Sequence, residues 1–155
     1  TTLNKKTQLG ECPGYFRPQS TETYFYNGEA VLEGELAPAG WKIPDSDDWQ
    51  ALKEYTKDSA SILKAGEWEV LKEGDTIDSG SNLTGFSAYP VGIWGAGKNI
   101  SQKQLVCYWT LNETENSIPE QSISFTGSST KFSVAATHVK NETYYKAFSI
   151  RCIKE

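Results

Sequence analysis

The sequence contains no methionine and a single histidine among its 155 residues. Because an initiator methionine is missing, we expect that a leading segment, with any export signal or lipid anchor, has been removed. The lone histidine, His138, has no nucleophile or carboxylate placed beside it in the sequence, and the serine-rich run 128–130 lacks the strained turn that exposes a nucleophile. We therefore predict a protein that is not an enzyme, has no catalytic residues and needs no cofactor.

Cysteine is scarce as well, with Cys12, Cys107 and Cys152 lying far apart. This spacing excludes the close cysteine pairs of a zinc site or of a dithiol redox motif. Three cysteines allow at most one internal disulfide. Cys107 and Cys152 lie in strand-like apolar runs, where an unpaired thiol behaves as a small hydrophobic side chain. One disulfide and three buried thiols are both compatible with this pattern.

The chain also lacks basic runs and long apolar runs. Lysine and arginine together number 15 against 20 acidic residues, which gives a formal net charge of −5, and the basic residues are scattered singly. Binding to phosphate groups needs a basic stripe, so neither nucleic acid nor an anionic membrane surface is an expected partner. No stretch approaches the roughly 20 apolar residues that a membrane-spanning helix requires.

Aromatic residues, in contrast, are abundant: five Trp, eight Tyr and six Phe. Most of them are expected in a core, and others can form a binding surface. A chain of 155 residues is long enough to bury such a core, and no repeat or linker divides it. We predict one domain over residues 1–155, with a turn-rich N-terminal extension at 1–29 and a core at 30–155.

The clearest helix signal begins at Asp45. This residue is typical of a helix N-cap, and Asp47 and Asp48 place negative charge where the helix dipole favours it. Trp49 and Leu52 then share one face of the helix. The pattern predicts a helix of about three turns.

Alternating apolar and polar residues dominate the second half of the chain and predict strands at 105–110, 122–126, 131–136 and 144–153. Weaker signals predict a strand at 24–26 that enters a tight turn at Asn27-Gly28, a short helix at 59–64 and a short strand at 68–71. Helices in the first half followed by several strands indicate the α+β class.

Four separated blocks follow one another along the chain: LAPAGWKIPD at 36–45 with Trp49 and Leu52, TGFSAYP at 84–90, YWT at 108–110 and FSIRCIK at 148–154. Together, from about residue 30 to the C-terminus, they resemble the Fibrobacter succinogenes major paralogous domain. That family is a bacterial surface and secreted module common among Bacteroidetes. The resemblance implies an exported protein, located at the cell surface or outside the cell.

The same resemblance implies a C-type lectin-like fold, because the family is similar to that superfamily. In this fold a helix packs on a small twisted antiparallel sheet, the two termini pair, and long loops carry function. Trp41 and Trp49 would then hold the helix onto the sheet, and the last predicted strand would close the sheet. The chain departs from its relatives after the Tyr-Trp pair, where small hydroxyl residues are usual and the run here is LNETEN at 111–116.

The candidate ligand-binding residues are Trp94, Tyr108, Trp109, Asn112, Glu113, Glu115 and Asn116. Trp94 lies between glycines, in a stretch that we expect to be a flexible loop where burial is hard to arrange. Tyr108 and Trp109 lead into the acidic run, and because they alternate faces we expect one of them to be core. Aromatic rings stack on the apolar faces of sugars, while amides and carboxylates orient the hydroxyl groups.

The acidic run offers the oxygen ligands that Ca²⁺ prefers, and Asp75 and Asp78 form a second acidic loop. The Glu-Pro-Asn loop and Trp-Asn-Asp strand of calcium-dependent sugar-binding lectins are missing. We therefore predict a solvated acidic loop without a metal ion, with a weak Ca²⁺ site at 112–116 as the alternative hypothesis. The glycosylation-type sequons at Asn82, Asn99, Asn112 and Asn141 are read as polar loop markers.

These observations predict a non-catalytic binding or adhesion module of a bacterial surface, which recognises a glycan or a protein through the loops around Trp94 and 112–116. The alternative is a structural or accessory subunit of a surface assembly, such as a fimbria, without a small ligand. Exposed aromatic residues in one concave patch would favour the first function, and a flat apolar face or an unpaired sheet edge would favour the second.

Overall fold

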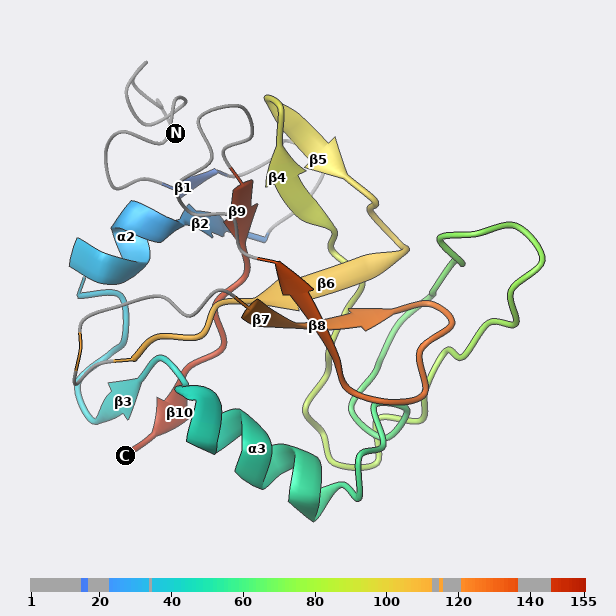
Figure 1. Cartoon of the computed structure of the whole chain (residues 1–155), viewed down its shortest axis with the longest axis horizontal. Coiled ribbons are helices and arrows are strands. Elements are labelled where there is room, and N and C mark those ends of the chain that lie inside the picture. Colours follow the sequence, from blue (N-terminus) through green and yellow to red (C-terminus); the bar gives the residue numbers. More distant parts are fainter. Residues whose placement is uncertain (1–14, 17–22, 34, 113–114, 116–120, 137–145) are drawn as a thin grey trace.

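The computed structural model describes residues 15–16, 23–33, 35–112, 115, 121–136 and 146–155, and within these ranges the chain has the predicted α+β composition (Figure 1). The helices are α2 (Gly28–Glu33) and α3 (Ser46–Tyr55). The strands are β1 (Tyr15–Phe16), β2 (Phe25–Asn27), β3 (Trp41–Lys42), β4 (Ile93–Gly95), β5 (Lys98–Ile100), β6 (Leu105–Tyr108), β7 (Gln121–Thr126), β8 (Ser133–Ala136), β9 (Lys146–Phe148) and β10 (Ile153–Lys154). None of the described helices is long and apolar enough to cross a membrane.

The strands form three small antiparallel sheets. The largest has the order β1-β2-β9-β4-β5, the second has the order β6-β7-β8, and the third pairs β3 with β10. Two isolated bridges connect β6 to residues next to strands of the large sheet. Gly92, just before β4, pairs with Val106, and Ser149, just after β9, pairs with Tyr108. Strand β6 therefore lies where the two larger sheets meet.

Helix α3 begins where the sequence predicts. The Asp45 carboxylate accepts a hydrogen bond from the Asp48 backbone N–H at 2.9 Å, and the Asp48 carboxylate accepts one from the Asp45 N–H at 3.0 Å. Lys42 adds an ion pair, with its Nζ 2.7 Å from Asp48 Oδ2, and the hydrogen bond to Asp48 raises the pKa of Lys42. Trp49 of this helix is buried, with its ring centre 5.7 Å from that of Tyr108, and Leu52 packs against the same core cluster, so both side chains attach α3 to β6.

The core lies on both faces of β6. Because successive side chains of a strand point to opposite faces, Val106 and Tyr108 lie in one hydrophobic cluster and Cys107 and Trp109 in another. The first cluster consists of Trp49, Ala60, Leu63, Trp68, Ala88, Val106, Tyr108 and Phe125. The second consists of Val31, Ile43, Cys107, Trp109, Leu111 and Phe148. Both faces of strand β6 are therefore covered by the core.

Several local predictions are wrong. No tight turn follows β2, because the Asn27 side chain accepts a hydrogen bond from the Ala30 N–H at 2.9 Å and thereby starts helix α2. The segment 59–64 forms turns and not a helix, and 68–71 forms no strand, although Trp68 is buried in the core. The backbone conformation of these segments therefore depends on tertiary packing and not on the local sequence pattern.

Other differences concern the ends of elements and single residues. The predicted strand at 144–153 is two short strands, β9 and β10, separated by residues 149–152. Trp41 is 44% exposed, so it does not hold α3 onto a sheet as expected. Cys107 and Cys152 both carry free thiols, and Cys12 lies outside the described residues.

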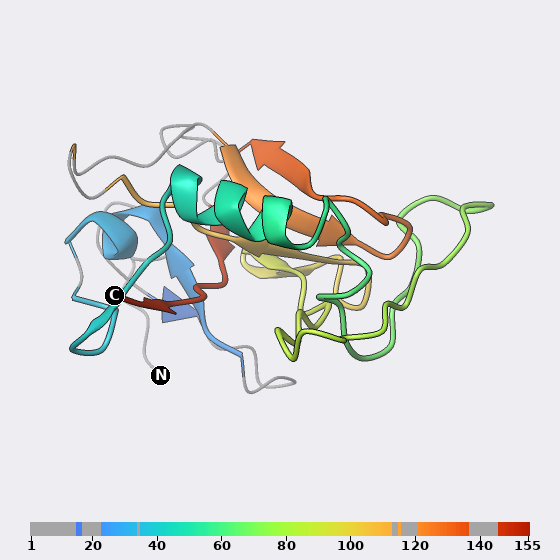
Figure 2. The same cartoon turned by 90° about the horizontal axis from the view of Figure 1, so that it is seen from below.

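The longest connection runs from α3 to β4 over residues 56–92 and contains no helix or strand. Figures 1 and 2 both show its middle part, in light green, projecting from the rest of the chain. Its base is held by Lys64, whose side chain is 0% exposed. The Lys64 ammonium donates to Asp78 Oδ2 at 3.1 Å, to the Thr126 carbonyl at 2.9 Å and to the Ser129 carbonyl at 3.2 Å.

We call Lys64, Asp78 and these two carbonyls the lysine clamp. Burial lowers the pKa of Lys64, although the hydrogen bond to Asp78 opposes this shift. Partial burial works to raise the pKa of Asp78, but hydrogen bonds from Ser61 and Lys64 outweigh it, so the pKa lies below its ordinary value. The Asp78 carboxylate is thus occupied by hydrogen bonds within the fold, which argues against Asp78 as a calcium ligand of the second acidic loop.

Candidate functional site

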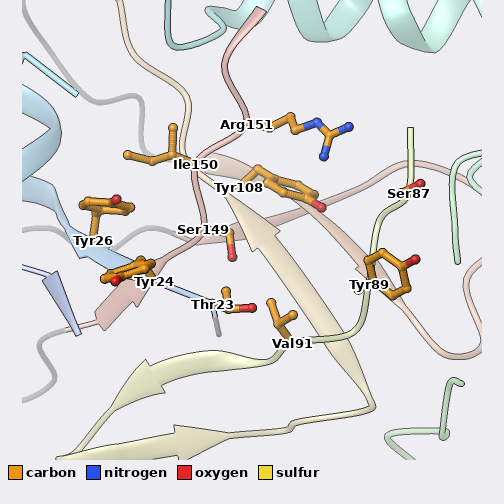
Figure 3. Close-up of a pocket in the computed structure, with 10 residues that line it drawn as sticks. All are labelled: Thr23, Tyr24, Tyr26, Ser87, Tyr89, Val91, Tyr108, Ser149, Ile150 and Arg151. Atoms are coloured by element: carbon orange, nitrogen blue, oxygen red, sulfur yellow. The ribbon is translucent and has the colours of Figure 1, made fainter. Parts of the chain in front are cut away.

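A pocket of about 280 Å³ opens where the start of β2, the segment before β4, the end of β6 and the segment between β9 and β10 come together (Figure 3). Its lining residues are Thr23, Tyr24, Tyr26, Ser87, Tyr89, Val91, Tyr108, Ser149, Ile150 and Arg151. Because tyrosine is the most frequent of them, we call it the tyrosine pocket. Its volume is close to the lower end of the range for small-ligand sites, which is about 300–1,000 Å³.

Backbone hydrogen bonds to β6 place one wall of the pocket. The Ser149 N–H donates to the Cys107 carbonyl at 3.0 Å, and the Trp109 N–H donates to the Ser149 carbonyl at 3.1 Å. Ser149 is therefore held beside Tyr108 in a parallel bridge. Arg151 follows two residues later and reaches the same pocket.

The opposite wall is placed by the long connection. Ala88 pairs with the base of that connection, donating its N–H to the Leu63 carbonyl at 2.9 Å and accepting from the Ala65 N–H at 3.0 Å. The ring of the next residue, Tyr89, then rests on Gly66, where an added Cβ would lie 2.8 Å from Tyr89 Cδ1. Gly66 also has a φ of +83°, which favours glycine. The Tyr89 ring can therefore keep this orientation only while residue 66 has no side chain.

The tyrosines differ in exposure. Tyr24 and Tyr89 form the open rim and are 40% and 53% exposed, whereas Tyr108 is buried. Burial raises the pKa of Tyr108, and the nearby Arg151 charge opposes the shift only in part. The Tyr108 phenol is therefore neutral at physiological pH and can both donate and accept hydrogen bonds.

Ser149 has a buried hydroxyl group in the pocket. The residue is 6% exposed, and its hydroxyl has no hydrogen-bond partner within the part of the chain that the structure describes. Figure 3 shows the hydroxyl directed toward the side lined by Thr23 and Val91. A buried hydroxyl without a partner costs about 1–3 kcal/mol, so a ligand group or a bridging water that bonded to it would recover that free energy.

Arg151 is the one charged residue of the lining. Its Nη2 donates to the Phe86 carbonyl at 2.5 Å, and its guanidinium carbon lies 4.6 Å from the centre of the Phe86 ring. None of the ten lining residues is a histidine, cysteine, aspartate or glutamate. The lining therefore provides ring faces, hydroxyl groups and a cation.

Trp94 does not lie in a flexible loop, and that prediction is wrong. It is half-buried in β4, opposite Asn99 of β5 and Ala147 of β9, and it packs against the small cluster of Phe25 and Ala147. The glycines beside it serve a hairpin, in which Ala96 and Gly97 take positive φ values of 49° and 76°. This is the geometry of a tight two-residue turn between antiparallel strands.

Trp109 is buried as well, and so is Tyr108, whereas one of the two was expected to be core. The Trp109 Nε1–H donates to the Tyr26 carbonyl at 2.7 Å, and its ring lies 4.5 Å from that of Phe148. Trp109 is therefore a packing residue and cannot stack on a ligand. Of the predicted site residues that the structure describes, Tyr108 alone is among the lining residues of the tyrosine pocket.

The described residues of the acidic run, Leu111, Asn112 and Glu115, are not among the residues that line this pocket. Asn112 is half-buried and accepts a hydrogen bond from the Glu115 N–H at 3.3 Å, and Glu115 is exposed. Glu113 and Asn116 lie outside the described residues. Among the residues that are described, no group of three or more His, Cys, Asp or Glu side chains could hold a metal ion. The weak Ca²⁺ site at 112–116 stays a hypothesis.

Tyr24, Tyr89, Ser149 and Arg151 were not among the predicted site residues. A signal for three of them was present, because Tyr89 lies in the TGFSAYP block and Ser149 and Arg151 lie in the FSIRCIK block. At the sequence level these blocks indicated only the family. Their polar and aromatic members are the ones that line the pocket.

A second cavity, of about 560 Å³, lies between α3 and strands β7 and β8, and we call it the α3 groove. It is lined by Ser46, Trp49, Gln50, Lys53, Thr110, Ile123, Phe132, Ser133 and Val134. Its aromatic rings, Trp49 and Phe132, are packed in or against the core, so they offer little free ring face. The tyrosine pocket, with two exposed rings at its rim, is the better candidate for a small-ligand site.

A family model described as "Fibrobacter succinogenes major domain" matches residues 4–154. The match takes in most of the segment before residue 30 as well as the four blocks. No curated protein and no solved structure matches the chain.

Proposed function

The chain belongs to the Fibrobacter succinogenes major domain family, and we propose that it is a non-catalytic binding module that recognises a glycan through the tyrosine pocket. One observation carries the proposal: a buried serine hydroxyl without a partner lies in a pocket whose rim is made of two exposed tyrosine rings. Sugars combine an apolar ring face with several hydroxyl groups. The pocket offers a matching partner for each of these two features.

The contribution of each wall follows from its chemistry. Tyr24 and Tyr89 provide the faces on which the apolar C–H groups of a sugar ring can stack. The neutral Tyr108 phenol and the Ser149 hydroxyl are hydrogen-bonding groups that lie deeper. The backbone of Ser149 is paired to β6, and that of Ala88, which precedes Tyr89, is paired to residues 63–65, so little ordering of this part of the lining is needed when a ligand binds.

The experiment is a glycan array probed with three forms of the protein. Wild type is expected to bind at least one class of glycan, and Tyr89→Ala is expected to lose that binding by about tenfold or more. Tyr55→Ala is the matched control, because Tyr55 is 79% exposed on α3 and does not line the pocket. Absence of binding to every glycan, or equal losses in the two variants, would overturn the proposal.

The finer fold assignment and the location belong to the same proposal. We infer a C-type lectin-like fold, supported by the pairing of β3 with β10, by the small antiparallel sheets and by the long connection at 56–92. An experimental structure that superimposes poorly on C-type lectin-like domains would contradict it. We also infer that the protein acts at the bacterial surface or outside the cell, which protease treatment of intact source cells followed by immunoblotting would test.

A second function is favoured by a different observation. Strand β8 lies at the edge of its sheet and pairs with β7 alone among the described strands, and Val134 on this strand is exposed beside the α3 groove. Such an edge can accept a further strand in a surface assembly. Sedimentation velocity of wild type and Val134→Lys tests this function: a concentration-dependent assembly that the lysine abolishes would support it, and a monomer at all concentrations would contradict it.

A further inference from the structure

We infer that the tyrosine pocket selects sugars that carry a carboxylate, such as uronic acid residues, and that Arg151 is the group that binds the carboxylate. This inference rests on the proposed function, because it names the class of ligand for the same pocket. It follows from the distribution of charge in the lining, from the way in which Arg151 is held and from the hydrogen-bonding capacity that Arg151 keeps.

The charged side chains in the lining of the pocket are of one sign, positive. Arg151 lines it without any acidic neighbour in the lining, although the whole chain carries a formal net charge of −5. Among the described residues, Lys42, Lys53, Lys64 and Lys103 have ion-pair partners, whereas Arg151 has none, and the other lysines without an ion-pair partner do not line the pocket. A positive charge that the fold leaves without a carboxylate is available for the carboxylate of a ligand.

The guanidinium is also held in place. Its hydrogen bond to the Phe86 carbonyl and its stacking at 4.6 Å over the Phe86 ring restrict its rotation. A guanidinium has five N–H donors in a planar fork that matches the two oxygens of a carboxylate, and the Phe86 carbonyl takes one of them. The group is therefore ordered before a ligand arrives and keeps donors for it.

The position of Arg151 fits a sugar acid better than a free anion. Figure 3 shows its guanidinium, the Tyr108 hydroxyl and the Tyr89 ring on the same side of the lining, with Tyr24 and Tyr26 on the other side. A ring that stacks on Tyr89 can thus direct a substituent toward Arg151. The net negative charge of the chain opposes an anionic ligand at long range, but this repulsion is screened beyond about 8 Å at physiological salt, whereas a direct contact with Arg151 is not.

The experiment uses paired probes and isothermal titration calorimetry on the full chain. Trisaccharides of galacturonic, glucuronic and mannuronic acid are each compared with the carboxyl-reduced sugar, which carries a CH₂OH group in place of each carboxylate. At least one acid is expected to bind about tenfold or more tightly than its neutral partner, as one charge-assisted hydrogen-bonded pair would give. Raising the salt concentration is expected to reduce this preference and to leave the neutral sugar's affinity unchanged.

Variants separate the charge from the pocket. Arg151→Gln is expected to remove the preference and keep the affinity for the neutral sugar within about twofold, and Arg151→Lys to keep part of the preference because the charge remains without the fork. Lys98→Gln is the matched control, since it removes the same charge from an exposed position on strand β5 that does not line the pocket. The salt dependence of wild type gives an independent result if the Arg151 variants lose their fold.

Each outcome has one meaning. Equal binding of acid and neutral sugar, or a preference that survives Arg151→Gln, overturns this inference and leaves the proposed function standing. Binding of neither member of any pair also overturns the inference, and the glycan array then decides separately whether the pocket binds glycans at all.

Discussion

Replacing Asp78 by alanine is expected to destabilise the fold more than replacing Lys64 by methionine, although both changes break the same ion pair. The reason is the unequal burial of the partners. The Lys64 side chain is 0% exposed, and that of Asp78 is 22% exposed. The Asp78→Ala change leaves an ammonium group enclosed with carbonyl acceptors only, whereas Lys64→Met leaves a carboxylate that still reaches water and keeps its hydrogen bond from Ser61.

The magnitudes follow from these environments. An uncompensated buried charge costs about 3–5 kcal/mol, which is the expected loss for Asp78→Ala. Lys64→Met leaves the Thr126 and Ser129 carbonyls without their donor, at about 1–3 kcal/mol, while its apolar chain keeps the contact with Trp68. The double variant is expected to be more stable than Asp78→Ala alone, because the stranded charge is gone.

Guanidinium chloride unfolding at pH 7, followed by tryptophan fluorescence, measures these differences. Glu69→Ala is the matched control, since the Glu69–Lys103 pair spans 3.6 Å between side chains that are both more than half exposed, and its loss is expected to cost less than about 1 kcal/mol. A larger cost for Lys64→Met than for Asp78→Ala, or a double variant whose cost is the sum of the two, would refute the reasoning.

Three further predictions follow from other parts of the structure. The pKa of Asp78 lies below its ordinary value of 3.8, so the ionised carboxylate contributes its full stabilisation of the fold above pH 3.8. This contribution is lost as the pH falls through the folded-state pKa. The denaturation midpoint of wild type is therefore expected to fall more steeply below pH 4 than that of Asp78→Asn. Gly66→Ala is expected to displace the Tyr89 ring and weaken glycan binding by about tenfold, at a stability cost of about 1 kcal/mol, whereas unchanged binding would contradict the account of the pocket wall. Burial raises the pKa of the Cys107 thiol to about 12, so alkylation at pH 8 followed by peptide mapping should label Cys152 in the folded protein and Cys107 only after unfolding.

The local elements were predictable where their signals are contained in a few neighbouring residues. The start of α3 is the clearest case, because Asp45 and Asp48 bond to each other's backbone across three positions. The central strand β7 was also predicted within one residue, since alternation along 122–126 is a property of the strand itself. The helix at α2 was missed because Asn27-Gly28 serves equally well as a tight turn or as a helix start.

Exposure of the aromatic residues could not be predicted in the same way. The sequence predicts Trp109 as a ligand-binding residue, yet its indole N–H donates to the Tyr26 carbonyl, 83 positions away in the sequence. Trp41 was expected to be packed and is exposed, whereas α3 packs on the core through Trp49 and Leu52. Whether a ring is covered depends on elements that are remote in the chain.

By itself the sequence determined the family, the α+β class and the place where α3 begins, because these depend on short motifs, on alternation and on hydrogen bonds between near neighbours. Only the tertiary structure decided which side chains form the tyrosine pocket and that Lys64 is buried. The Arg151–Phe86 contact spans 65 positions, and the Lys64 hydrogen bonds to the 126–129 turn span 62 and 65. Contacts of this length arise when the core closes around β6, and no local pattern encodes them.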